Sequence, residues 1–189
     1  EAVGVVLENG DEHYAGIVVS ALDPRHTFLN LVEPRELPTD LVDNIRKYKF
    51  QGVSAKVNFA LDGLPEYPAL PGQADIYRGF INIAPSIDYI ERAFDEAKYG
   101  DFSRRPYIDG CIQSTLDPDL TPPGKHVMSC FVQYCPYKLK NSDWDSKRDN
   151  LGDTVQKMLE SYFPGFTDLV IHREVVTPLD IERTVGLSE

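Results

Sequence analysis

The feature that most constrains the fold is a strict alternation of side chains between Gly52 and Asp62. Successive side chains of a β-strand point to opposite faces of a sheet, so a period of two predicts a strand with two different faces. One face carries Val53, Ala55, Val57, Phe59 and Leu61, and the other carries Ser54, Lys56, Asn58, Ala60 and Asp62. A chain built around this strand has to bury the first face, while the second is left for solvent or a ligand.

The rest of the sequence predicts further strands and helices around this one. Predicted strands cover Val3–Glu8 and Glu12–Ala21, joined at Asn9-Gly10, then Arg78–Ala84, Tyr107–Ser114, His126–Tyr134 and Val170–Val176. Predicted helices begin at Asp23-Pro24, at Thr39 (to Tyr48), at Ser86 (to about Gly100), at Ser142 (to about Phe163) and at Leu179 (to Val185). This order of elements predicts an α+β fold with a mixed, mostly antiparallel sheet and helices packed on one face.

Three helices have predicted buried stripes. In the helix from Thr39 the stripe is Leu41, Ile45 and Tyr48. In the helix after Ser86 the stripe is Ile87, Ile90, Phe94 and Ala97, and in the helix after Ser142 it is Trp144, Leu151, Val155, Leu159 and Tyr162. On the strands, the side chains expected beneath these helices are Ile81, Ile83, Ile108, Ile112, Met128, Cys130 and Val132.

The opposite face of the predicted sheet mixes amides, hydroxyls and aromatic rings, a composition that suits a ligand cavity. It comprises Ser54, Lys56, Asn58, Phe80, Asn82, Cys111, Gln113, Ser129, Phe131 and Gln133. From this set we select Lys56, Asn58, Phe80, Asn82, Phe131 and Gln133 as candidate substrate-binding residues. The alternative is a solvated face with scattered aromatic rings, since antiparallel sheets commonly leave one face wet.

Composition excludes several classes of partner. A net charge of −11 does not fit nucleic-acid binding, which depends on clustered Lys and Arg, or binding to an anionic membrane surface. No apolar run approaches the ~20 residues that span a bilayer, so no transmembrane segment is predicted. Three cysteines in apolar stretches fit reduced, buried thiols in a cytoplasmic protein, and no metal site is predicted.

A search for catalytic motifs returns little. The 13 glycines never occur as Gly-x-Gly, so the chain has neither a dinucleotide-binding fingerprint nor a P-loop. His126 and Cys130 have the spacing of neighbours on one strand face, which leaves a Cys–His pair or simple packing open. Lys56 is the most informative single charge, because a lysine on a central strand has to find a partner or extend to solvent.

Several segments together resemble a known family. They are Gly4–Gly10, Ile17–Ala21, Lys56–Asp62, Ala84–Phe94, Ser114–Pro118, Pro122–Val127, Phe131–Tyr134, Pro164–Phe166 and Thr177–Arg183. In combination they are similar to phytoene desaturase and phytoene dehydrogenase-related FAD-dependent oxidoreductases. This amine-oxidase-like group includes the branch of pyridine nucleotide-disulfide oxidoreductase domain-containing proteins.

The resemblance implies an organisation and a function. Residues 1–22 would be a hairpin and returning strand from the edge of the flavin domain, 23–176 the substrate-binding domain, and 177–189 the start of the return. Ser20 and Ala21 match a region expected near the cofactor. The Gly-rich ADP-binding unit has no counterpart, so the implied FAD would be held by other flavin-domain segments of the intact protein. The implied function is the substrate-binding portion of an oxidoreductase acting on a hydrophobic small molecule; the alternative is a non-catalytic binding or dimerisation module.

Overall fold

The computed structural model describes residues 2–188, which divide into two compact units. The first comprises the described residues up to Phe50 together with Ser188, and the second runs from Gln51 to Leu187. The boundaries implied by the family resemblance concern how the chain is shared between flavin and substrate domains, and they stay predictions.

The first unit opens with the predicted hairpin. Strand β1 (Gly4–Val6) pairs antiparallel with β2 (Glu12–Tyr14), and Gly10 takes a φ of +91° that favours glycine. The predicted two-residue turn is wrong, because five residues separate the strands and the Leu7 N–H donates to Asp11 O. The extension of the second strand to Ala21 is also wrong, since β1 offers only three residues to pair with.

Short helices complete this unit. They are η1 (His26–Leu31, a π-helix), η2 (Pro34–Glu36) and α1 (Thr39–Lys47). Asp23 Oδ1 accepts from the His26 N–H at 3.0 Å, so the predicted Asp23 cap is present. Helix α1 begins at the predicted residue and buries Val42 and Ile45, whereas Tyr48, predicted on the buried stripe, lies beyond its end and is exposed.

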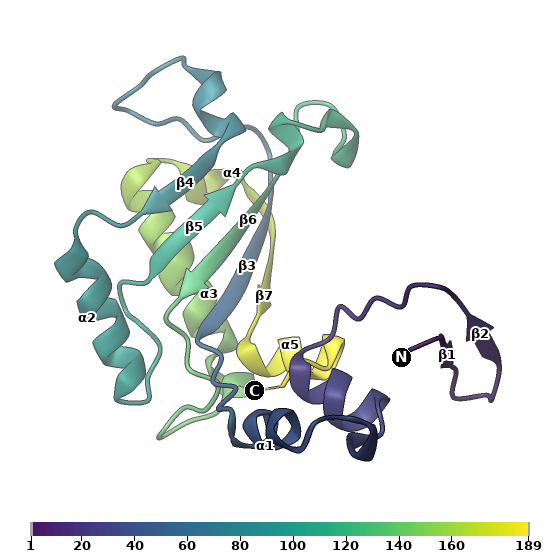
Figure 1. The fold of residues 1–189 in the computed structure, drawn as a ribbon. Coiled ribbons are helices and arrows are strands. Elements are labelled where there is room, and N and C mark those ends of the chain that lie inside the picture. The colour runs from purple at the N-terminus through teal and green to yellow at the C-terminus, as the bar shows by residue number, and fades with distance from the viewer. Residues whose placement is uncertain (1, 189) are drawn as a thin grey trace. The chain divides into compact units, whose positions relative to one another are not determined.

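The second unit is built on one five-stranded sheet in the order β4–β5–β6–β3–β7 (Figure 1). The strands are β3 (Ser54–Leu61), β4 (Phe80–Ile83), β5 (Tyr107–Cys111), β6 (His126–Gln133) and β7 (Val170–Val176). All the pairings are antiparallel, so the α+β class is confirmed and the sheet is simpler than the mixed one predicted. The alternation that opens the sequence analysis holds, because Ala55, Val57, Phe59 and Leu61 are all buried.

Helices α3 (Trp144–Tyr162) and α4 (Phe166–Leu169) cross behind this sheet in Figure 1, with α2 (Ile87–Lys98) beside it and α5 (Pro178–Val185) after β7. Three 3₁₀ turns, η3 (Ala74–Arg78), η4 (Gln113–Thr115) and η5 (Pro118–Leu120), connect strands. The predicted stripe of α3 is confirmed at Trp144, Leu151, Val155 and Leu159, which join the predicted strand residues in one core. Each such side chain contributes roughly 1.5–3 kcal/mol when fully buried.

Two details of the helices differ from prediction. The N-cap of α3 is Asp143, whose carboxylate accepts from the Ser146 N–H at 2.8 Å, and not Ser142. Ser86 caps α2 and Ala97 is buried, both as predicted, whereas Ile87 of the predicted stripe is 82% exposed and Ala93, which lies outside that stripe, is buried. The helix therefore packs through small side chains where the apolar spacing also predicted large ones. No helix in the described part of the chain combines the length and apolar character needed to cross a membrane.

The contact between α3 and β7 is unusually close at Gly152. A Cβ at this position would lie 2.8 Å from Val175 Cγ2 and 2.6 Å from Arg173 Nε. One turn earlier, Arg148 donates to Val175 O at 3.0 Å and forms a bidentate pair with Asp180 at 2.6 and 2.7 Å. Asp180 is itself part of the capping box that Thr177 makes at the start of α5. The absence of a side chain at position 152 therefore lets α3, β7 and α5 meet.

We predict that Gly152→Leu lowers the free energy of unfolding by about 1–3 kcal/mol, because the new side chain overpacks the contact with β7. Urea denaturation measures the change. Gly79→Leu is the matched control, since a Cβ there meets nothing within 4 Å and its φ is −112°. Equal stability of the Gly152→Leu variant and the wild type would contradict this description of the contact.

His126 forms a partly buried hydrogen bond at one end of the sheet. Its Nδ1 lies 2.9 Å from Ser114 Oγ, and the same hydroxyl oxygen accepts from the Val127 N–H at 3.2 Å. Either Ser114 or His126 can donate in this pair, depending on the tautomer of the imidazole, because a hydroxyl oxygen can accept two hydrogen bonds. Among residues 2–188, His126 bonds to Ser114 and makes no hydrogen bond to Cys130, so simple packing, the other possibility that the sequence left open, describes the relation between His126 and Cys130. Burial lowers the pKa of His126 below its ordinary value of 6.5.

A lowered histidine pKa means that the unfolded chain binds the proton more readily than the folded one. We predict that this contribution to stability is complete above pH 6.5 and is lost as the pH falls toward the folded pKa. The measurement is the unfolding free energy against pH for wild type and for His126→Gln, whose amide can still accept from Ser114. The wild type should lose more stability on acidification; parallel curves would contradict the prediction.

Candidate functional site

The sheet face opposite α3 carries two rows of side chains that cross all five strands. The strand register shows which residues lie next to one another, and each row runs in strand order from β4 to β7. One row is Asn82, Asp109, Phe131, Lys56 and Val176, and the next is Phe80, Cys111, Ser129, Asn58 and Glu174. We call this surface the open face. Its mixture of amides, charges and aromatic rings agrees with the composition expected from the strand alternation.

A hollow of about 490 Å³ lies on the open face, and we call it the open-face hollow. Its apolar walls include Ala60, Leu120 and Val127, and its polar groups are Lys56, Asn58, Gln113, Ser129, His172 and Glu174. A concave, partly apolar surface with a few polar groups is the usual form of a small-molecule site. The hollow is therefore the best candidate site in this unit.

The predicted lining residues distribute unevenly around the hollow. Lys56 and Asn58 line it. Phe131 pairs with Lys56 in the register beside it, while Phe80 and Asn82 lie on the edge strand β4. Gln133 lies beyond the two rows and donates to Ser54 Oγ at 3.1 Å. Ser20 and Ala21 belong to the other unit, where Ser20 Oγ lies 2.7 Å from Thr27 Oγ1.

Strand β7 supplies two lining residues that the sequence reasoning missed, His172 and Glu174. Their spacing of two residues within the predicted strand is a signal that both face one side. What could not be read from the sequence is that β7 pairs with β3, and so brings them next to Asn58 and Ala60.

Asn58 is held on both sides by hydrogen bonds. Its Nδ2 donates to Glu174 Oε2 at 2.9 Å, and its Oδ1 accepts from Ser129 Oγ at 2.8 Å. Three strands thus contribute to one polar chain across the floor of the hollow. Gln113 Oε1 is buried there without a hydrogen-bond partner among the described residues. The hollow is therefore lined by both hydrogen-bond donors and hydrogen-bond acceptors.

Lys56 extends from the open face as an exposed side chain between Phe131 and Val176. No carboxylate of the described residues lies within 4.0 Å of its ammonium group. Cys111 occupies the same face, and burial raises the pKa of its thiol, while the charge of Lys56 acts in the opposite direction. The lysine is thus a cation available to a ligand, and Cys111 stays a thiol at neutral pH.

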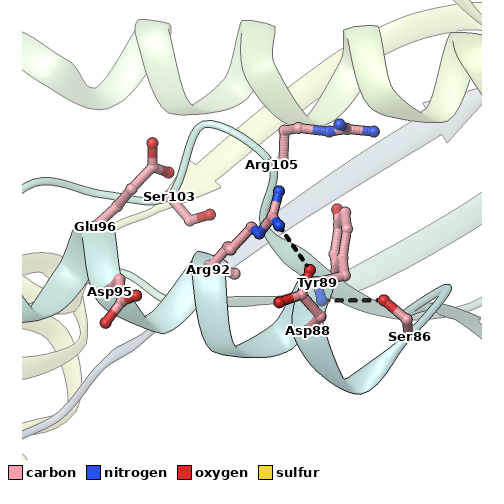
Figure 2. A pocket seen from close by; sticks show the side chains of 9 residues that line it. Ser86, Asp88, Tyr89, Arg92, Asp95, Glu96, Ser103 and Arg105 are labelled. Atoms are coloured by element: carbon pink, nitrogen blue, oxygen red, sulfur yellow. Dashed lines mark hydrogen bonds and ion pairs between the residues drawn. The ribbon is translucent and has the colours of Figure 1, made fainter.

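A second hollow, of about 470 Å³, runs along α2 (Figure 2). Here Arg92 pairs with Asp88 at 2.9 Å, and Arg105 stacks over the Tyr89 ring at 5.7 Å from its centroid. Tyr89 donates to Pro106 O at 2.8 Å, and burial raises its pKa to about 12. Acidic and basic side chains alternate along this hollow and offset one another, so it presents no convergent set of groups.

Comparison with known proteins finds relatives whose names include an oxidoreductase domain or an isomerase, although no protein-family model matches the chain. It is 38% identical over 196 residues to "Pyridine nucleotide-disulfide oxidoreductase domain-containing protein 2" of Rattus norvegicus, covering 97% of this chain and 33% of that protein. The Mus musculus protein of the same name is 37% identical, with 98% and 33% covered. "Prolycopene isomerase 2, chloroplastic" of an Oncidium hybrid cultivar is 27% identical, with 94% and 28% covered.

A solved structure supports the fold alone. The crystal structure of the PF1083 protein from Pyrococcus furiosus aligns with a TM-score of 0.53 at 14% identity, covering 92% of this chain and 34% of that one. The chain spans about a third of the length of the relatives that it matches. The predicted relationship to the pyridine nucleotide-disulfide oxidoreductase domain-containing branch is supported, and the narrower likeness to phytoene desaturases stays a prediction. These relatives indicate an oxidoreductase-family domain.

Proposed function

We propose that this chain forms the substrate-binding wall of an FAD-dependent oxidoreductase, with a hydrophobic small molecule held against the open face. The observation that carries the proposal is the open-face hollow, whose floor combines apolar side chains with the ordered amide of Asn58 and the unpaired cation of Lys56. The names of the relatives support oxidoreductase chemistry, and the prolycopene isomerases are named for a molecule of the apolar class proposed.

Residues 51–187 show no cradle for the ADP part of FAD. Phosphate groups are usually bound by Gly-rich turns and by free amides at helix N-termini. The sequence contains no Gly-x-Gly, and in the second unit one first-turn amide of each of α2, α3 and α5 already bonds to its own cap, Ser86, Asp143 and Thr177. In this proposal the cofactor is therefore held by other segments of the intact protein, and the open face supplies position and exclusion of water.

In this proposal the cofactor and the side chains of the open face have different roles. FAD would supply the redox chemistry when bound. Phe131 and Phe80 provide apolar surface on the open face, while Lys56 and Asn58, which line the hollow, offer hydrogen bonds that orient a guest. A non-catalytic binding or dimerisation module is the other function that we considered, and no contact of the described residues favours it.

Flavin content tests the proposal. Protein expressed from the complete reading frame should copurify with the visible absorption spectrum of a flavin and release FAD on denaturation, whereas the 189-residue chain alone should be colourless. Mass spectrometry of the released cofactor identifies it. A complete protein that is well folded, free of flavin and unable to take up added FAD would refute the proposed enzyme.

A further inference from the structure

The chain of hydrogen bonds through Asn58 has a fixed direction. An ionised carboxylate can only accept hydrogen bonds, so the group of Asn58 that faces Glu174 has to be its amide nitrogen. The amide oxygen then faces Ser129, whose hydroxyl donates to it at 2.8 Å. A hydroxyl alone would accept either orientation of the amide. Glu174 is therefore the residue that decides which end of the Asn58 amide faces which neighbour.

This orientation determines what the open-face hollow offers to a ligand. The Nδ2 group of Asn58 carries two hydrogens, and only one has a partner among residues 2–188. Lys56 lies two residues away on the same face of β3, about 7 Å along the strand, and its ammonium is likewise unpaired. The two groups are donors that line the same hollow as the apolar side chains of Ala60, Leu120 and Val127.

We propose that the open-face hollow recognises a carboxylate on an otherwise apolar molecule, through Lys56 and the free Nδ2 hydrogen of Asn58, with Glu174 as the positioning residue. A carboxylate matches a cation and a neighbouring N–H donor, because both of its oxygens accept. The inference rests on the proposed function in naming the substrate class of that site.

A matched pair of probes tests the recognition. Decanoate and decyltrimethylammonium have the same apolar chain and opposite charges. In ¹H–¹⁵N spectra of the 189-residue chain, titration with decanoate should shift the side-chain amide signals of Asn58, which are identified by their loss in Asn58→Ala. The cation should leave them unchanged. Lys56→Met, which keeps an apolar stem, should weaken decanoate binding about fivefold or more.

Substitution of Glu174 distinguishes its proposed role in orienting the Asn58 amide from the purely electrostatic effect of its negative charge. Glu174→Gln removes a negative charge near the hollow, so electrostatics alone predicts tighter binding of decanoate. The same substitution removes the carboxylate that can only accept hydrogen bonds, so the Asn58 amide is free to turn. A positioning role therefore predicts that decanoate binding weakens about fivefold. Glu91→Gln, an exposed position on α2, is the control for net charge. Tighter binding by Glu174→Gln would overturn the positioning role.

The outcomes also separate this inference from the proposed function. If both probes bind in the hollow with equal affinity, carboxylate recognition is refuted while an apolar chamber remains. If neither probe perturbs Asn58, Ser129 or Lys56, the substrate class proposed here is refuted. Flavin content of the complete protein is measured independently and decides the enzyme proposal by itself.

Discussion

Burial of one face of strand β3 is the constraint on which the rest of the second unit depends. Ala55, Val57 and Leu61 have no exposed surface, and Phe59 has 2%. Because this strand pairs with β6 on one side and β7 on the other, its register aligns the buried face of the whole sheet. A slip by one residue would exchange Lys56 and Asn58 with these apolar side chains, at a cost of several kcal/mol, so the register is strongly specified.

The helical layer is held to this sheet by packing and by charge. Leu151, Val155 and Leu159 of α3 fill the space beneath the strands, and Gly152 allows β7 to approach. At the same contact, Arg148 joins α3 to Asp180 of α5, which also caps its own helix. The pair with Arg148 and the capping bonds hold the pKa of Asp180 below its ordinary value even though burial acts in the opposite direction. The helix layer thus fixes β7, and with it Glu174, beside the hollow.

The open face derives its chemistry from the same alternation that builds the core. Every second residue of β3 is excluded from the core and becomes a candidate for function, which places Lys56 and Asn58 on one surface. A fixed sheet is a rigid support for such groups, and neighbouring strands complete their hydrogen bonds. Asn58 alone could orient its amide in two ways; between Ser129 and Glu174 it has one. Rigid, directional donors are what a binding site requires to discriminate between ligands.

The sequence by itself determined the five strands of the larger sheet, the inward and outward residues of each, the long helix stripe and the absence of a Gly-x-Gly loop. These are local properties, since periodicity and glycine spacing involve only near neighbours along the chain. The sequence reasoning failed where residues distant in sequence decide: the end of the second strand of the hairpin, the exposure of Ile87 on α2, and the pairing of β7 with β3. Only the tertiary structure placed Glu174 beside Asn58, 116 residues away, because no local pattern encodes which strand lies next to which. The predicted surface follows from the sequence, and the hollow within it follows from the sheet order.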